Sequence, residues 1–441
     1  MPPAASLETA GSGIALAELW SDLDAEERLL HFQSLHPANA GECFIALSVA
    51  SQAALILDLP PAERRLWLRL LPPDEAADVI QDAPDEARAS LLDLLDSTAR
   101  AEVSALLVYA EDEAGGKMSP RYARLRPEMT AAQAISYLRQ QRDRQLELIY
   151  YVYVLDEGEH LLGVVSFREL FSAPADRVVS SVMKRNVVSV PEDLDQEAVA
   201  HELTRAGLLA VPVVDAEGRM KGIITADDVL DVVRQEATED IQKIGGVEAL
   251  DLPYFDTRLR TLVRKRAGWL SVLFLGQMLT ETAMGAFREE ITQAIVLALF
   301  VPLVISSGGN SGSQASTLMI RAMALGEVRL SDWWRVIQRE LMSGLWLGAI
   351  LGIIGVARIV AWEGLFGSYG DQYWRIALTV SISLLGVVTW GTLTGSMLPF
   401  ALRRLGFDPA SASAPFVATL SDVTGLVIYF TIAKAVLLGE L

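Results

Sequence analysis

A single carboxylate, Asp422, lies inside a long apolar segment at residues 413–438. A charged side chain in the middle of a membrane helix costs about 2.5–3.5 kcal/mol on insertion scales, so such residues are rare and usually functional. Asp422, its neighbours Ser421 and Thr424, and nearby carbonyl groups offer only hard oxygen ligands, which suit Mg²⁺, Ca²⁺ or Mn²⁺. Asp422 is therefore the first candidate cation ligand. The alternatives are a hydrogen bond between packed helices, or a span that begins later.

A second candidate is the glycine-rich stretch Ser306–Gly312, inside the apolar segment 293–320. Together with Pro302, this stretch predicts a break in the helix, and unwound backbone at membrane depth requires surrounding protein or a watery cavity. The simpler interpretation is close helix packing through small residues. The sequence leaves both interpretations open.

A third group of candidates is a set of acidic residues that precedes the apolar half of the chain. Like charges at this density repel one another unless cations lie between them. For any one of these residues the commoner explanation is a solvated acidic face. The set comprises Asp215, Glu217, Asp227, Asp228, Glu236, Glu239, Asp240, Glu248, Asp251 and Asp256.

The elements that position these residues belong to two chemically different halves. The 441-residue chain has 51% hydrophobic residues and a net charge of −19. Residues 1–262 carry 45 acids and 24 bases, whereas residues 263–441 carry 11 acids and 13 bases. This asymmetry predicts an acidic cytosolic part attached to a membrane domain. The acidic excess argues against a nucleic-acid partner.

Cysteine usage and the N-terminus add two expectations. Cys43 is the one cysteine, which excludes an intramolecular disulfide framework and a cysteine-based zinc site. The first residues have no basic region followed by an apolar run, so we expect no signal peptide.

Five apolar segments reach the roughly 20 residues needed to cross a bilayer. Basic residues precede the first and fifth segments and also lie between the second and third. The positive-inside rule therefore predicts a multi-pass protein of the inner or plasma membrane, with a cytoplasmic N-terminus and an external C-terminus. The segments are 267–287, 293–320, 341–362, 375–402 and 413–438.

Residues 1–115 predict an all-α superhelical domain. Proline-led helix starts recur at a constant spacing, at Pro60-Pro61, Pro72-Pro73 and Pro84. Acidic residues follow each proline, as is typical of the first turn of a helix. Short helices repeated at a fixed period stack into a superhelix.

Residues 116–233 contain a second repeat, in which Asp156–Leu170 aligns with Asp215–Val229 at a constant offset and without a gap. Each copy predicts two strands and then a helix. The duplicated α/β unit, at about 116–178 and 179–233, resembles a tandem pair of CBS domains. That resemblance implies a regulatory module that often binds adenine nucleotides or metal ions.

The helix of each repeat begins with a capping-box pattern, Ser166-x-x-Glu169 or Thr225-x-x-Asp228. Helix capping alone explains this pattern, so it does not by itself predict a nucleotide site. Residues 234–262 then predict a connecting helix to about Lys243, a break at Gly245-Gly246, and a run into the membrane domain, 263–441.

Taken together, the chain resembles the MgtE family of magnesium channels and transporters over nearly its whole length. The family order is a helical N domain, a CBS pair, a connecting plug helix and a five-span pore. The most specific motifs are Gly308-Gly309-Asn310-x-Gly312-x-Gln314, the stretch ATEDIQKIGG at 237–246, Asp408-Pro409-Ala410, and Pro415-x-x-Ala418-Thr419-Leu420-Ser421-Asp422-Val423-Thr424-Gly425.

The resemblance implies a homodimer with the pore on its axis. Asp422 matches the Mg²⁺-selecting carboxylate, and the backbones of Ala418 and Gly425 match pore-lining positions near it. Asp408 is a weaker pore candidate, because Asp-Pro is also an ordinary start of a helix. Two departures affect the ion path. Ala414 replaces a common asparagine, and Arg288 stands where an acidic residue is common.

The resemblance also implies that cytosolic Mg²⁺ bridges acidic surfaces and holds the pore shut. The matching acidic positions are Asp215, Glu217, Asp227, Glu248 and Asp251, with Asp256 as a further candidate. The resulting hypothesis is a Mg²⁺-selective, Mg²⁺-gated channel that catalyses no covalent reaction, with ATP as a further CBS ligand. The alternatives are a carrier of Co²⁺ or Mn²⁺, or a membrane-anchored nucleotide or metal sensor.

Overall fold

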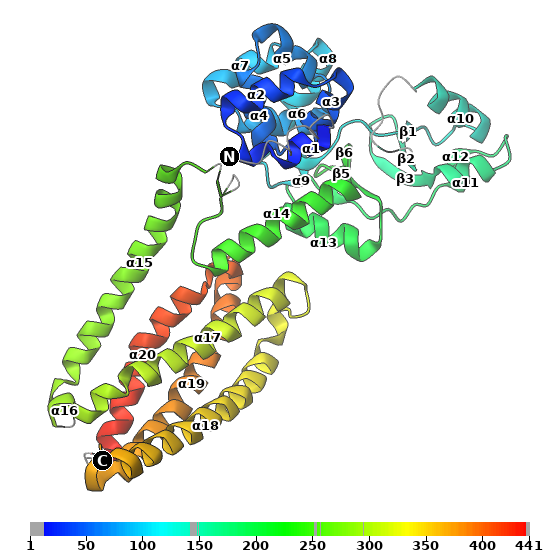
Figure 1. Cartoon of the computed structure of the whole chain (residues 1–441). Coiled ribbons are helices and arrows are strands. Elements are labelled where there is room, and N and C mark those ends of the chain that lie inside the picture. Colours follow the sequence, from blue (N-terminus) through cyan, green and yellow to red (C-terminus); the bar gives the residue numbers. More distant parts are fainter. Residues whose placement is uncertain are drawn as a thin grey trace. The chain divides into compact units, whose positions relative to one another are not determined.

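The computed structural model describes residues 13–141, 148, 150–250, 254–255, 257–293 and 295–437 (Figure 1). Internal contacts divide the chain into two compact units. The first unit holds residues 1–236 and 251–256, and the second holds residues 237–250 and 257–441.

Short helices make up the N-terminal part of the first unit. After α1 (Gly13–Glu18), successive helices begin at the same constant spacing as the proline-led starts, which extends the predicted period in both directions along the chain. These helices are α2 (Ala25–Ser34), α3 (Pro37–Ala46), α4 (Val49–Asp58), α5 (Pro61–Leu68), α6 (Pro73–Asp82), α7 (Asp85–Leu92) and α8 (Ser97–Leu106).

Arginines at the fourth position of these helices explain part of the period. The Nε atom of Arg64 donates to the Leu59 carbonyl at 2.9 Å, and that of Arg88 donates to the Ala83 carbonyl at 3.0 Å. Each acceptor lies at the C-terminal end of the preceding helix, where carbonyl groups have no partner within the helix. In α5 and in α7, this arginine therefore ties the helix to the one before it.

The two CBS-like repeats form two three-stranded sheets with the same topology. In each sheet the first strand pairs parallel with the second, and the second pairs antiparallel with the third. The second and third strands of the two sheets are related by the same constant offset as the sequence repeat. The strands are β1 (Arg124–Leu125), β2 (Tyr151–Leu155), β3 (Leu161–Ser166), β4 (Val190–Pro191), β5 (Ala210–Val214) and β6 (Met220–Thr225).

The first predicted capping pattern forms in full and the second forms in part, since Asp228 accepts from Thr225 without the reciprocal bond. The Ser166 hydroxyl and the Glu169 carboxylate cap the start of α11 (Phe167–Ser172) reciprocally. The Thr225 hydroxyl donates to Asp228 at 2.6 Å, before α14 (Ala226–Ile244). The remaining helices of the repeats are α9 (Ala114–Lys117), α10 (Ala131–Gln140), α12 (Val179–Val182) and α13 (Gln196–Ala206).

The connecting helix α14 ends at Ile244, just beyond the predicted end at Lys243. Gly246 follows with a φ of +73°, a conformation that favours glycine. Within the second unit, Gly246 lies against Trp269, because a Cβ atom here would lie 2.7 Å from the indole Nε1. The predicted break after the helix is therefore a tight turn packed against Trp269.

Five long helices form the second unit (Figure 1), and each overlaps one of the five predicted apolar segments. They are α15 (Leu259–Ala286), α17 (Val301–Ala324), α18 (Trp333–Phe366), α19 (Tyr373–Arg404) and α20 (Ala414–Leu437). Shorter connections are α16 (Arg288–Gln293), η4 (Ile295–Leu299), η5 (Leu330–Asp332), η6 (Gly370–Gln372) and η7 (Pro409–Ser411).

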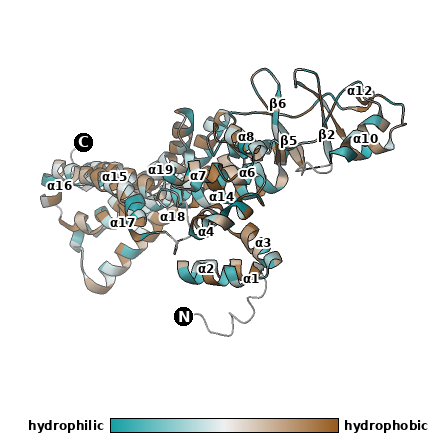
Figure 2. Ribbon diagram, turned by 90° about the horizontal axis from the view of Figure 1, so that it is seen from above, coloured by the Kyte–Doolittle hydropathy of each residue, from teal (hydrophilic) through white to brown (hydrophobic). Residues whose placement is uncertain are grey.

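By length and hydropathy, three stretches among the described residues meet the criteria for a membrane span. They are Leu330–Phe366, Gly370–Arg404 and Ala414–Val436. The helices α15 and α17 fall short because hydrophilic residues interrupt their apolar sequence, as the mixed colours of Figure 2 illustrate. Length and hydropathy thus support three of the five predicted spans among the described residues, and α15 and α17 are the two that they do not support.

The predicted break in the second apolar segment is wrong, because α17 runs unbroken through Ser306–Gly312. Its glycines serve instead as contact points with α19. A Cβ atom on Gly308 would lie 2.5 Å from Cγ1 of Val387, and one on Gly312 would lie 2.8 Å from the Gly391 carbonyl oxygen. Close packing through small residues, the simpler interpretation, is the one that the structure supports.

We expect Gly395→Ala to destabilise this packing, because its Cβ atom would overlap the Gly312 carbonyl oxygen. The expected loss is about 1–3 kcal/mol, as for other overpacked interiors. Gly364→Ala is the control, since a Cβ atom there meets nothing within 4 Å. Thermal unfolding of the detergent-solubilised chain measures both, and equal unfolding temperatures for Gly395→Ala and wild type would contradict the packing account.

Candidate functional site

A cavity of about 450 Å³ lies among α15, α17 and α20, with Asp422 in its wall. Its polar lining residues come from all three helices. Its apolar lining comes from Met284, Val301, Pro302, Ile305, Ala418 and Leu426, together with Gly309. The polar ones are Gln277, Thr280, Ser306, Asn310 and Asp422.

The predicted residues Asp422 and Ala418 meet here because they lie one turn apart on α20. Gly309 of α17 lies opposite them. A Cβ atom on Gly309 would lie 3.5 Å from Ala418 Cα and 3.8 Å from Asp422 Oδ1. The absence of a side chain at Gly309 thus brings the α17 backbone to the carboxylate and leaves the neighbouring Asn310 in the lining. The donor set is hard oxygen, which suits Mg²⁺ or a similar divalent cation.

Several other residues of the predicted motifs lie outside this lining. Gly425 faces α19, where a Cβ atom would lie 3.0 Å from Val387 Cγ1. Gly308 and Gly312 also face α19, and Gln314 is exposed. Pro415 lies beside Gly246, whose Cβ position is 3.2 Å from the Pro415 ring. The three glycines therefore set the helix packing around the cavity.

Asp408 is engaged by a basic residue. It caps η7 by accepting from the Ala410 amide at 2.8 Å, and it accepts from Lys243 Nζ at 2.6 Å. Burial disfavours the charge on Lys243, but hydrogen bonds to Asp408 and Glu239 outweigh it, so the pKa of Lys243 lies above its usual range. The ion pair joins the end of α14 to the start of α20 within the second unit.

The predicted cytosolic acids lie in different environments. Asp215 is buried in its hairpin, where it accepts from Arg219 at 2.8 Å and pairs with Lys221 at 3.2 Å. Glu217 pairs with Arg219 at 3.0 Å, whereas Asp227 and Glu248 are exposed. Asp215 and Glu217 thus already have cationic partners.

Asp251 and Asp256 lie outside the described residues. Within the described part of the chain, no group of three His, Cys, Asp or Glu side chains is placed to hold a metal ion.

Gln277 and Thr280 are site residues that the sequence interpretation missed. They lie three positions apart on α15, so they share one face of the helix. Polar residues at this spacing in an otherwise apolar span were the available signal.

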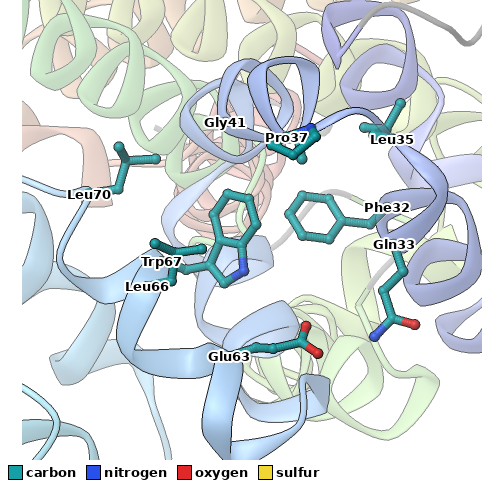
Figure 3. A pocket seen from close by; sticks show the side chains of 10 residues that line it. Phe32, Gln33, Leu35, Pro37, Gly41, Glu63, Leu66, Trp67 and Leu70 are labelled. Atoms are coloured by element: carbon teal, nitrogen blue, oxygen red, sulfur yellow. The ribbon is translucent and has the colours of Figure 1, made fainter.

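A separate apolar groove of about 590 Å³ lies between α2, α3 and α5 (Figure 3). The Phe32 and Trp67 rings, with centroids 4.9 Å apart, form part of its wall. Glu63 is the acidic residue among its described lining residues. This lining lacks the oxygen-rich character of the cavity at Asp422.

The helical bundle, its carboxylate-lined cavity and the attached N-terminal modules define a membrane transporter of divalent cations. The family described as "Divalent cation transporter" matches residues 301–432, and the MgtE intracellular N domain matches residues 14–112. The CBS domain matches residues 113–176 and 179–235.

Relatives match along most of the chain. The "Magnesium transporter MgtE" of Thermus thermophilus is 42% identical over 96% of this chain and 92% of its own length. The protein of that name from Enterococcus faecalis is 33% identical, over 76% of this chain and 71% of its own length. The chain belongs to the MgtE family.

A solved structure is also similar to part of the chain. This is the "Crystal structure of the cytosolic domain of the Mg2+ channel MgtE in complex with ATP". It shares 42% sequence identity, covers 52% of this chain and 92% of its own, and has a TM-score of 0.47.

We expect Asp215→Asn to destabilise the first unit. Burial alone raises the pKa of Asp215, but hydrogen bonds from Arg219 and Lys221 lower it from 3.8 to about 2. The lowered pKa contributes roughly 2 kcal/mol of stability. This contribution is fully present at pH values above 3.8, the ordinary pKa of the carboxyl group. It is lost as the pH falls through about 2, the pKa of Asp215 in the folded chain. The penalty of the substitution should therefore shrink below about pH 4.

Denaturant unfolding of the full chain between pH 2 and pH 7 measures this penalty. Asp156→Asn is the matched comparison, because Asp156 occupies the equivalent position of the first repeat but is 40% exposed and pairs with His160, so its penalty should be smaller. A pH-independent penalty at Asp215 would contradict the electrostatic account.

Proposed function

We propose that this chain carries Mg²⁺ across the membrane and catalyses no covalent reaction. The observation that carries the proposal is the cavity in which Asp422 faces further oxygen donors between three helices. The 42% identity to a protein named a magnesium transporter supports the choice of Mg²⁺. The negative potential of the cell interior favours cation entry by about 2.3 kcal/mol per charge per 100 mV.

The proposed assembly is a homodimer in the inner or plasma membrane, with the N-terminus in the cytoplasm and the C-terminus outside. A pore on a two-fold axis presents one Asp422 from each chain. Because Mg²⁺ retains several of its waters, a pair of carboxylates that contact the hydrated ion is a chemically reasonable filter. Crosslinking in native membranes that yields only monomer would contradict this assembly.

Two alternatives remain distinct from this proposal. Hard oxygen sites discriminate imperfectly among divalent cations, so a carrier of Co²⁺ or Mn²⁺ is the alternative within transport. A membrane-anchored nucleotide or metal sensor needs neither a carboxylate at membrane depth nor a cavity around it. The cavity at Asp422 therefore favours transport.

We expect Asp422→Ala to reduce Mg²⁺ uptake into Mg²⁺-starved cells by at least about tenfold, because it removes the one charged side chain among the described lining residues of the cavity. Asp371→Ala, the same change on an exposed connection, should leave uptake unchanged. Radiotracer or total-metal uptake at matched expression checks both variants. Wild-type uptake by Asp422→Ala would disprove the assignment of the pore.

Gating by internal Mg²⁺ is the proposed role of the exposed cytosolic acids. Ions that neutralise facing acidic surfaces hold them together, and loss of those ions lets them separate. Asp227 and Glu248 are both exposed. They suit this role better than Asp215, which is buried and pairs with Arg219 and Lys221. The ion pair of Lys243 with Asp408 provides a contact between the connecting segment and α20.

We expect the combined change Asp227→Asn, Glu248→Gln and Asp251→Asn to weaken inhibition by internal Mg²⁺ by about tenfold or more, since it removes three negative charges. Patch recordings with stepped internal Mg²⁺ measure the inhibition. Asp176→Asn serves as a control, because Asp176 is an exposed acid outside the proposed set. Unchanged inhibition in the triple variant would rule out the proposed gating.

Adenine-nucleotide binding is proposed for the cleft between the two CBS repeats. A cavity of about 180 Å³ there is lined by Tyr151, Tyr153 and Lys184, among others. Aromatic rings stack on an adenine base, and an ammonium group pairs with phosphate. Calorimetric titration with ATP should show saturable binding that Lys184→Met weakens several-fold. The absence of binding to the wild-type chain would contradict this proposal.

A further inference from the structure

One face of α15 forms a second polar wall of the cavity that holds Asp422. Gln277 and Thr280 line this wall, and Met284 continues it one turn further. Gly276 permits the close approach of α15 to α20, because a Cβ atom there would lie 3.0 Å from Cγ2 of Thr419. The two polar side chains therefore face α20 at the level of the carboxylate.

Gln277 of α15 and Asp422 of α20 line the same cavity. An amide can donate from its nitrogen and accept at its oxygen at the same time. A carboxylate is an acceptor, so the Gln277 nitrogen can donate to it while the Gln277 carbonyl oxygen accepts from another group. The Gln277 amide thus offers a donor to the carboxylate and a further acceptor oxygen to the cavity.

Thr280 supplies a further polar atom. Its hydroxyl oxygen is buried and has no hydrogen-bond partner among the described residues, although the residue lines the cavity. Buried hydroxyl groups without a partner are uncommon, because burying one costs free energy. A ligand that brings its own hydrogen-bonding groups into the cavity would satisfy this hydroxyl.

We propose that Gln277 and Thr280 recognise the water shell of the transported cation. Gln277 is a positioning residue for Asp422, and its carbonyl oxygen, together with the Thr280 hydroxyl, accepts hydrogen bonds from waters on a hydrated divalent cation. The inference rests on the proposed function, since it assumes that the cation binds at Asp422. It assigns α15 a direct part in selecting the ion.

The choice of ion follows from hydration chemistry. Mg²⁺ gives up its waters reluctantly, so its recognition depends on groups that contact the water shell. Mn²⁺ suits the same carboxylate, carbonyl and water ligands, and we expect it to exchange its waters for protein oxygens more readily than Mg²⁺, which dehydrates reluctantly. Loss of acceptors for the water shell therefore weakens Mg²⁺ binding more than Mn²⁺ binding.

The experiment compares Mg²⁺ and Mn²⁺ flux through the full chain in liposomes, in Gln277→Leu and Thr280→Val. The expected result for Gln277→Leu is a rise of about fivefold to tenfold in the half-saturating Mg²⁺ concentration relative to Mn²⁺. Thr280→Val should shift this ratio in the same direction by a smaller factor. Thr282→Val is the matched control, because the Thr282 hydroxyl donates to the Met278 carbonyl of its own helix at 3.4 Å.

The ratio of the half-saturating Mg²⁺ and Mn²⁺ concentrations separates ion recognition from folding. Partial misfolding lowers the maximal flux of both ions and leaves this ratio unchanged. An unchanged ratio in Gln277→Leu, or an equal shift in Thr282→Val, overturns the inference. Asp422→Ala is measured in the same preparation. If Asp422→Ala abolishes Mg²⁺ flux but Gln277→Leu leaves the ratio unchanged, only this inference fails. If Asp422→Ala retains Mg²⁺ flux, the proposed function fails as well.

Discussion

The contact between α17 and α19 is the constraint on which the cavity depends. Gly308 and Gly312 bring the two backbones so close that a methyl group at either position would meet a neighbouring atom within 3 Å. This contact fixes the rotation of α17 about its axis. Because Gly309 and Asn310 follow Gly308 directly, the same rotation turns them toward Asp422 on α20. The cavity is thus a consequence of helix packing in the bundle.

Much of the fold follows from sequence periodicity. The regular spacing of the N-terminal helix starts and the constant offset between the CBS repeats are local regularities, and the structure reproduces both. Asp422 was also accessible from the sequence, since a carboxylate in an apolar span is costly and therefore conspicuous. Glycine in Ser306–Gly312 was ambiguous, because the same residue type suits a helix break and a close contact. Only the identity of the neighbouring helix decides between them.

Other site features depend on residues that are distant in sequence. Lys243 and Asp408 are separated by 165 positions, so no local pattern pairs them. In the sequence, Gln277 is one of several polar residues in an apolar segment. Its place in the site follows only from the position of α15 beside α20. The polar residues that keep α15 and α17 from meeting the composition criteria for a span are in part those that line the cavity. Weak apolar character in these two helices is thus a signature of the site.

The central claim is that the cavity at Asp422 passes Mg²⁺ down its electrochemical gradient. The most direct measurement is ion flux into liposomes that contain the purified wild-type chain, under an imposed inside-negative potential and at low internal Mg²⁺. The account predicts saturable Mg²⁺ entry that increases with the potential and exceeds the entry of monovalent cations. A folded chain that passes no Mg²⁺ under these conditions would contradict the account.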